Sequence, residues 1–558
     1  MNSKCFNHHA SLSFFRLVSL SWQGSAAITF AAFLLCSTLS RGAVQATTTV
    51  SDKARNRAER ALREGEFQTA EQLYRELLAK NEHDEVARLG LSYALLKQRK
   101  LQESFDNAAC VVAANPLSAR AHALLGSVLL TAGDFRLATE EFRTALSIKD
   151  TESLAVAGLA LIDFYENRFT ASLNGLRRAA FLNPNEPDHF FSLAQAAART
   201  ENYKEAADAY ERFLAIAPRT DADRRARIRG LIDFLRYLGN QSALYVPSGA
   251  SRVTVPFVAK DNRPMITVHI NGGKEALGFV LDTGSGISVI SQETAQRLGL
   301  RAVARGGMAR AVGGGGRFEI VYGFLSSIEI GEARIENVPV YIRKFFDIDG
   351  RKPVDGYIGL SVINKFLATL DYRAQTLTIN RGRVDADDLT TVSDASAVSS
   401  ATGAASTNVS EIPLRTTSSG FLSGEVQLEG LNKPLNFIID TGASISVISE
   451  QLAAQEELSR FKRDSQMRVY GAAGIAENVK MILLPRVAFG AMAREKVDAV
   501  VLDLDPINET TGFSQTGIIG GNFLRHFRVT FDFQRNVMRF ESLTGAKDAE
   551  PHPASARK

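Results

Sequence analysis

A thirteen-residue phrase occurs twice in this chain and constrains its fold more than any other feature. Residues 279–291 read FVLDTGSGISVIS and residues 437–449 read FIIDTGASISVIS, with nine of the thirteen positions identical. In each copy an apolar run leads into Asp-Thr-Gly, and Ile or Val then alternates with Ser. This order predicts a strand, a tight turn that presents a carboxylate, and a second strand. A single Asp-Thr-Gly is typical of a surface turn, but a surface turn needs no matched second copy.

The correspondence between the two copies continues downstream. Gly313–Gly316 lies as far behind the first copy as Gly471–Gly474 lies behind the second. The run Gly356-Tyr357-Ile358-Gly359 then corresponds to Gly517-Ile518-Ile519-Gly520. The sequence therefore predicts two lobes of similar size, each with an acid turn, a glycine-flanked hairpin and an apolar-Gly element.

These motifs resemble those of the aspartic proteases, and Asp440–Ser444 is most similar to the retropepsin branch. Two lobes in a single chain are similar to pepsin. The resemblance covers residues 250–380 and 411–543, and it implies an all-β, two-lobed, retropepsin-like domain. A peptide would lie between the lobes as an extended strand.

The resemblance implies that Asp282 and Asp440 form the catalytic pair. Two adjacent carboxylates cannot both ionise readily, so one serves as acid and the other as base, and their shared proton belongs to the pair. The resemblance further implies that Thr283 and Thr441 hydrogen-bond across the pseudo-twofold axis.

Small residues complete the implied site. Gly284 and Gly442 let the opposite turn approach, because glycine has no Cβ. In pepsin-like sites the hydroxyl at the position of Ser285 donates to the carboxylate, and Ala443 lacks that donor. We therefore expect a raised pKa for the dyad. The candidate flap glycines, which would let the flaps open, are Gly313, Gly314, Gly471 and Gly474.

Residues 54–240 precede the lobes as an array with a capping helix, and within it residues 54–218 repeat with a period of 34. Three series of equivalent positions show the period: Phe67, Leu101, Phe135, Phe169 and Tyr203; Ala70, Ser104, Ala138, Ser172 and Ala206; Tyr74, Ala108, Phe142, Leu176 and Tyr210. This period, with small residues where helices cross, resembles the tetratricopeptide repeat. The resemblance implies an all-α superhelix whose concave face binds a protein partner.

A capping helix is predicted over Asp221–Gly239, where apolar residues recur at helical spacing. Its arginines would either form a solvated face or bind an acidic partner. We expect the lobes to fold and cut short peptides without the array, and we expect the array to recruit the protein substrate.

The remaining segments are simpler. Residues 1–46 read as a signal peptide that ends in Val-Gln-Ala, so we expect a bacterial protein that is exported to the periplasm or secreted. A retained N-terminal membrane anchor is the alternative. Residues 381–410 are rich in Ser, Ala and Thr and predict a flexible linker, and residues 544–558 form a polar tail.

The net charge and the missing motifs argue against several other classes of function. A net charge of +4 gives no basis for nucleic-acid binding. The chain has no P-loop, no His-Glu-x-x-His and no paired-Cys spacing, so we expect neither cofactor nor metal. Cleavage of the signal would leave Cys110, which could be a thiol nucleophile but sits among apolar helical residues and favours a packed role.

These observations predict an aspartic endopeptidase with a recruiting array. The alternative is a non-catalytic scaffold whose lobes hold a peptide without cutting it. A third possibility is that each lobe pairs with its twin in another molecule, although two different turns within one chain favour the internal pair.

Overall fold

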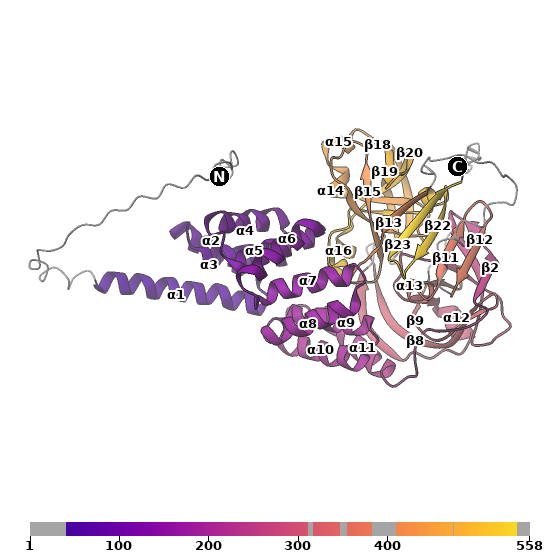
Figure 1. Cartoon of the computed structure of the whole chain (residues 1–558), viewed down its shortest axis with the longest axis horizontal. Coiled ribbons are helices and arrows are strands. Elements are labelled where there is room, and N and C mark those ends of the chain that lie inside the picture. The colour runs from indigo at the N-terminus through magenta and orange to yellow at the C-terminus, as the bar shows by residue number, and fades with distance from the viewer. Residues whose placement is uncertain (1–40, 311–315, 346–353, 382–408, 472–473, 544–558) are drawn as a thin grey trace, which may run out of the picture.

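The computed structural model describes residues 41–310, 316–345, 354–381, 409–471 and 474–543. A helical array packs beside a β-rich, two-lobed part (Figure 1). This confirms the predicted fold class. Several predicted features lie outside the described residues: signal-peptide residues 1–40, Gly313 and Gly314, most of the linker, and the tail. Of the helices that the structure describes, none is long and apolar enough to span a membrane.

The array consists of antiparallel helix pairs in which each even-numbered helix is the second of its pair. The helices are α1 (Arg41–Glu64), α2 (Phe67–Lys80), α3 (Glu85–Lys97), α4 (Leu101–Ala114), α5 (Ala119–Ala132), α6 (Phe135–Ile148), α7 (Ser153–Tyr165), α8 (Phe169–Leu182), α9 (Pro187–Arg199), α10 (Tyr203–Ile216) and α11 (Ala222–Leu238). Half-buried Cys110 lies in α4.

The three repeated series have distinct places in these helices. The first series supplies the first residue of every second helix, from Phe67 in α2 to Tyr203 in α10. The small residues of the second series are all fully buried. The third series, Tyr74 to Tyr210, is buried beside them. Small side chains let paired helices approach, and the larger ones fill the layer between pairs.

The first lobe is built on one large sheet. Its strands are β1 (Val246–Gly249), β3 (Val258–Lys260), β4 (Arg263–Ile270), β5 (Leu277–Leu281), β6 (Ser288–Ser291), β7 (Ala304–Arg310), β8 (Arg317–Ile330), β9 (Ala333–Arg343) and β10 (Gly356–Ile358), with helices α12 (Gln292–Arg297) and α13 (Leu360–Ile363).

The second lobe repeats this plan. Its strands are β14 (Arg415–Thr416), β15 (Leu422–Leu428), β16 (Leu435–Ile439), β17 (Ser446–Ser449), β18 (Lys462–Gly471), β19 (Gly474–Phe489), β20 (Met492–Leu502) and β21 (Gly517–Ile519), with helices α14 (Glu450–Ala453), α15 (Glu456–Ser459), α16 (Asp505–Thr511) and α17 (Gly521–Leu524).

A third sheet joins the two lobes. Its order is β13-β23-β22-β11-β12-β2, formed by β2 (Arg252–Pro256), β11 (Leu367–Asp371), β12 (Thr376–Asn380), β13 (Val409–Pro413), β22 (Phe527–Asp532) and β23 (Val537–Ser542). Neighbouring β11 and β22 come from different lobes, and Arg528 bridges to Asp371 at 2.7 Å. Because β13 pairs with β23, regular structure starts at Val409, inside the predicted linker and two residues before the predicted start of the second lobe at 411. Likewise, β1 begins before the predicted start of the first lobe at residue 250.

One edge of the array docks on the lobes through equivalent turns. Arg99, Gly133, Asn167 and Glu201 follow α3, α5, α7 and α9, and all four have a positive φ. Three of these turns contact the second lobe: Arg99 donates to Ser514, Asn436 donates to the Gly133 carbonyl, and Asn167 donates to the Leu414 carbonyl. The fourth contacts the first lobe, because Glu201 pairs with Lys365 at 3.5 Å. The array therefore bridges both lobes.

The capping helix α11 packs on β7, the strand that leads to the first predicted flap. The ring of Phe234 stacks on Tyr322 at 4.3 Å, and Arg227 donates to the Met308 carbonyl at 2.9 Å. Arg224 lies over the Phe213 ring. Arg224 and Arg227 of the capping helix therefore contact other parts of the chain. We had predicted that the arginines of this helix either form a solvated face or bind an acidic partner.

Phe513 of the second lobe is fully buried in the core of the array. Its ring lies 4.9 Å from Phe135 and 5.0 Å from Tyr165. A chain that lacked the array would expose Phe513 and Tyr322 to water. The structure therefore argues against the expectation that the lobes fold alone, because the two parts share apolar core.

We predict that Phe513→Ala lowers the free energy of unfolding by about 3–5 kcal/mol, because it opens a cavity among buried aromatic rings. Denaturant titration of the full chain measures the change. Phe181→Ala is the matched control, because Phe181 is 85% exposed and its loss should change stability by about 0.5 kcal/mol or less. Equal losses in the two variants would contradict the shared core.

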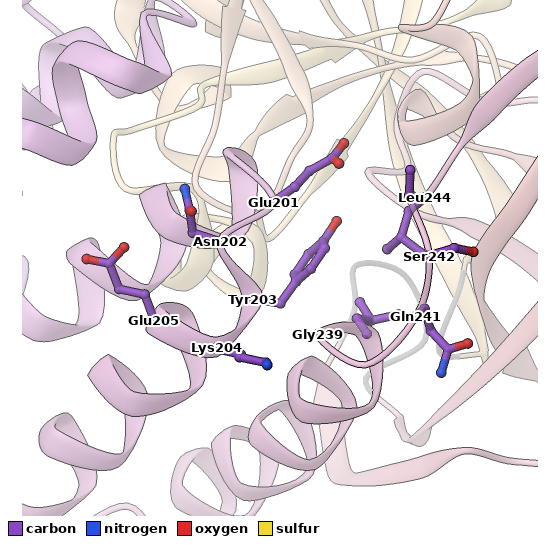
Figure 2. Close-up of a pocket in the computed structure, with 11 residues that line it drawn as sticks. Glu201, Asn202, Tyr203, Lys204, Glu205, Gly239, Gln241, Ser242 and Leu244 are labelled. Carbon is purple, nitrogen blue, oxygen red and sulfur yellow. The ribbon is translucent and has the colours of Figure 1, made fainter.

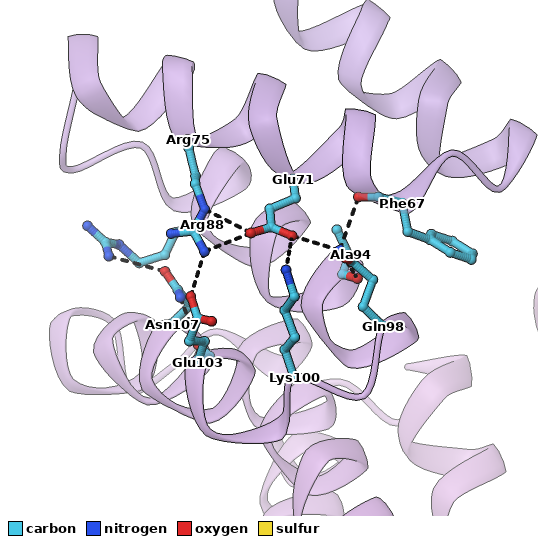
Figure 3. A network of polar contacts seen from close by, with 9 residues as sticks. All are labelled: Phe67, Glu71, Arg75, Arg88, Ala94, Gln98, Lys100, Glu103 and Asn107. Atoms are coloured by element: carbon cyan, nitrogen blue, oxygen red, sulfur yellow. Dashed lines mark hydrogen bonds and ion pairs between the residues drawn. The ribbon is translucent and has the colours of Figure 1, made fainter. Parts of the chain in front are cut away.

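A polar network joins the first two repeats around Glu71 (Figure 3). The Glu71 carboxylate accepts hydrogen bonds from Arg75 at 2.9 Å, Lys100 at 2.8 Å and Gln98 at 2.9 Å. Burial alone would raise the pKa of Glu71, but the bonds from Lys100, Arg75 and Gln98 outweigh burial and lower the pKa to about 2. Folding therefore favours the charged carboxylate.

We predict that Glu71 stabilises the array above pH 4.5 and that this contribution disappears as the pH falls toward 2. A depressed folded-state pKa has this sign, because the unfolded chain takes up the proton first. Glu71→Gln should cost about 2–3 kcal/mol at pH 7. Circular dichroism of the helices measures the free energy of unfolding of the parent protein and of Glu71→Gln from about pH 2 to pH 7. A difference between them that stays constant with pH would contradict the prediction.

Candidate active site

The two acid turns meet between the lobes. The backbone N–H of Gly284 donates to Asp282 Oδ1 at 2.9 Å, and the N–H of Gly442 donates to Asp440 Oδ1 at 2.8 Å. The two carboxyl groups share a hydrogen bond. A Cβ on Gly284 would overlap the Asp440 carboxylate, and one on Gly442 would lie 2.6 Å from Asp282 Oδ1. Both positions therefore require glycine.

Four hydrogen bonds tie the turns together. Thr283 Oγ1 donates to the Ile439 carbonyl at 2.8 Å and accepts from the Thr441 N–H at 3.0 Å. Thr441 Oγ1 donates to the Leu281 carbonyl at 2.6 Å and accepts from the Thr283 N–H at 3.1 Å. Both threonine side chains are fully buried. Each hydroxyl acts as both donor and acceptor, so the turns cannot separate without leaving buried polar groups unpaired.

The Ile-Gly elements lie beside the turns in both lobes. The Asp282 N–H donates to the Ile358 carbonyl at 2.9 Å, and the Asp440 N–H donates to the Ile519 carbonyl at 3.0 Å. Two serines that we did not predict as site residues hold these elements. Ser288 accepts from the Gly359 N–H at 3.0 Å, and Ser446 accepts from the Gly520 N–H at 3.1 Å. Their recurrence at the same place in both phrases was the available signal.

Burial and the neighbouring Asp440 carboxylate raise the pKa of Asp282 well above its ordinary value. Burial also raises the pKa of Asp440, but bonds from Asp282 and from the backbone of Gly442 and Ala443 act against it. Asp440 accepts from the Ala443 N–H at 3.1 Å in addition to Gly442. Donors to a carboxylate favour its charged form, and Asp440 accepts one more backbone hydrogen bond than Asp282 does.

The prediction that the Ser285 hydroxyl donates a hydrogen bond to Asp282 is wrong. Ser285 Oγ donates instead to the Ile287 carbonyl at 2.7 Å, two residues along its own turn. A serine in a turn often satisfies the local backbone in this way. The asymmetry between the turns therefore comes from the Ala443 N–H rather than from the hydroxyl that Ala443 lacks.

Each lobe contains one long hairpin that carries candidate flap glycines. Gly471 and Gly474 pair at the end of the β18–β19 hairpin. The equivalent β7–β8 hairpin holds the predicted glycines Gly313 and Gly314 beyond its described residues. Next to that tip, Arg310 pairs at 3.1 Å with Glu509 of α16, so the first hairpin reaches the opposite lobe.

A pocket of about 450 Å³ lies between the start of α10 and the segment that follows α11 (Figure 2). Glu201, Tyr203 and Lys204 line it on one side, and Gln241 and Leu244 line it on the other. It contains neither aspartate of the dyad, so we do not assign the active site to it.

Comparisons with known proteins agree with this arrangement. The family model described as aspartyl protease matches residues 266–362 and 424–523, and each match contains one acid turn. The tetratricopeptide repeat model matches residues 55–110 and 158–219. A comparison with curated proteins found no match.

Solved structures with similar parts include an aspartic proteinase from Irpex lacteus, 13% identical over 52% of this chain and 97% of its own, with a TM-score of 0.34. A tetratricopeptide repeat protein of Thermus thermophilus is 19% identical over 33% of this chain and 98% of its own, with a TM-score of 0.29.

Both β lobes therefore match the aspartyl protease family model. The helical array in front of them consists of tetratricopeptide repeats.

We predict that Thr441→Val destabilises the protein by about 2–5 kcal/mol, because it leaves the Leu281 carbonyl and the Thr283 N–H unpaired in a buried site. Denaturant unfolding measures the loss. Thr530→Val is the control: Thr530 is buried in the joining sheet, and among the residues that the structure describes its hydroxyl bonds only to Thr369, at 2.9 Å. If Thr441→Val were no more harmful than Thr530→Val, the reciprocal bonds would not hold the lobes together.

Proposed function

We propose that this protein is an aspartic-type endopeptidase that hydrolyses peptide bonds with Asp282 and Asp440. The observation that carries the proposal is the buried pair of adjacent carboxyl groups, each held by a glycine N–H in a matching turn, whose pKa values are both raised by burial. An acid and a base at one point are what amide hydrolysis by an activated water requires.

The proposed reaction assigns a different role to each aspartate. Asp440, the more strongly hydrogen-bonded carboxylate, takes a proton from a water molecule as the water oxygen attacks the peptide carbonyl carbon. Asp282 gives its proton to the carbonyl oxygen, which produces a neutral gem-diol. The C–N bond then breaks as Asp440 passes its proton to the leaving nitrogen and Asp282 recovers a proton from a gem-diol hydroxyl. The site returns to its starting state.

The alternative function is a non-catalytic scaffold that holds a peptide between the lobes. The tetratricopeptide match supports a binding role for the array, but that role is compatible with catalysis. Both aspartates are present with their supporting threonines and glycines. A scaffold would need neither the second carboxylate nor the raised pKa of Asp282, so the geometry favours the enzyme.

We also propose that the array recruits a protein substrate or partner and that the protein is exported. The turns after α3, α5, α7 and α9 contact the lobes, so recruitment would use other faces of the repeats. Such an array sits at a constant position relative to the dyad, which would raise the local concentration of substrate near the lobes.

We predict that Asp282→Asn and Asp440→Asn each lower kcat/KM on a peptide library by about a hundredfold or more. The double variant should be little worse than either single one, because the pair acts as a unit. Asp208→Asn, an exposed acid on α10, is the control and should keep full activity. Turnover that survives in either single variant would rule out a shared site, and no turnover in the parent protein would favour the scaffold.

A further inference from the structure

The face of the first-lobe sheet that carries Asp282 also carries Arg263. Met265 of β4 pairs with Val280 of β5, so Arg263 stands across from Asp282 in the antiparallel ladder. Side chains alternate along a strand, so the odd-numbered residues of β4 and the even-numbered residues of β5 share one face. Ile266 and Val268, on the other face, lie in the apolar core.

Two further residues belong to the face that carries Asp282. Tyr357 of β10 pairs with Val280, and Arg343 ends β9 opposite Ser291 of β6. Tyr357 lies within electrostatic range of Arg263 and Arg343 and of both aspartates, while burial raises its pKa. Two guanidinium groups and a phenol therefore stand beside the dyad on the side of the first lobe.

The second lobe has apolar residues at the three equivalent positions. Ser423 pairs with Ile438 as Met265 pairs with Val280, so Phe421 corresponds to Arg263. Ile518 pairs with Ile438 and corresponds to Tyr357. Leu502 pairs with Ser449 and corresponds to Arg343. Phe421, Leu502 and Ile518 belong to one apolar cluster.

Arg263 is only partly satisfied by the residues that the structure describes. Its side chain is 16% exposed, and its carboxylate partner Asp261 lies at 3.6 Å. Its Nε is buried and has no hydrogen-bond partner among the described residues. A buried guanidinium with an unused donor is costly, and a carboxylate is the group whose geometry it matches best.

We infer that the two lobes select different substrate side chains on the two sides of the scissile bond. The first lobe, through Arg263 with Arg343 and Tyr357 nearby, selects an acidic side chain. The second lobe, through Phe421, Leu502 and Ile518, selects an aliphatic or aromatic side chain. The substrate class is therefore a peptide in which an acidic and an apolar residue flank the cleaved bond. This inference rests on the proposed peptidase function.

The test is a cleavage profile of the full-length protein at about pH 6, where substrate carboxylates are ionised. Matched peptides carry Glu or Gln on the acidic side of a cut found in the library. The parent protein should prefer the Glu peptide, and Arg263→Met should reduce that preference about ten- to hundredfold. The loss should appear in KM, with kcat on the Gln peptide retained.

Phe421→Arg is the reciprocal variant, because it places a cation at the equivalent position of the second lobe. This variant should also cleave peptides that carry an acidic residue on the side of the bond that the second lobe contacts. A direct binding readout uses Asp440→Asn, which cannot cut, with calorimetric titration of the Glu and Gln peptides. Adding Arg263→Met to that variant should equalise their Kd values.

The outcomes distinguish failure of the proposed function from failure of the proposed selectivity. If the parent protein cuts no peptide, the proposed function fails. If it cuts without preferring Glu over Gln, the function stands and this inference is overturned. The inference also fails if Arg263→Met lowers kcat equally on both peptides and moves the pH–rate profile, because Arg263 would then position the charge of the dyad rather than read the substrate.

Discussion

The reciprocal hydrogen bonds between Thr283 and Thr441 are the constraint on which the rest of this structure depends. They join two turns that are far apart in the sequence, and they bring two carboxyl groups into contact. Like charges would separate these carboxylates if the backbone allowed it. The buried threonines prevent this, and burial together with the neighbouring carboxylate raises the pKa of Asp282. The unusual acid chemistry of the pair therefore follows from a mechanical connection between lobes.

A pseudo-symmetric frame makes small differences between the lobes informative. The strands, the threonines and the Ile-Gly elements correspond closely, whereas the Ala443 N–H contacts its carboxylate and no equivalent bond from Ser285 to Asp282 is seen among the described residues. The residues beside the dyad differ more strongly, with Arg263 in one lobe and Phe421 in the other. The features that both lobes share hold the site together. We attribute the different roles of the two aspartates, and the selectivity for substrate, to the features that differ between the lobes.

The sequence predicted those features that repeat locally. The 34-residue period identified the buried layers of the array, and the duplicated phrase located both turns and both Ile-Gly elements. Long-range pairings were missed, because nothing in the local pattern of Val409 or Arg528 indicates which strand it will join. The same reason explains why the shared core around Phe513 was not expected. Ser285 was misassigned because a hydroxyl in a turn has several acceptors within reach, and sequence cannot choose among them.

Carboxyl-carbon NMR of protein labelled at aspartate tests whether the pair retains a proton. Following Asp282 and Asp440 from about pH 3 to 8, with each Asn variant for assignment, shows how many protons the pair holds. We expect one carboxyl group of the pair to keep its proton well above the ordinary range near pH 4. Its titration should move to lower pH when Asp440 is replaced by Asn, because the neighbouring charge is removed while burial remains. If both carboxyl groups titrated near pH 4 in the parent protein, the pair would not hold a retained proton.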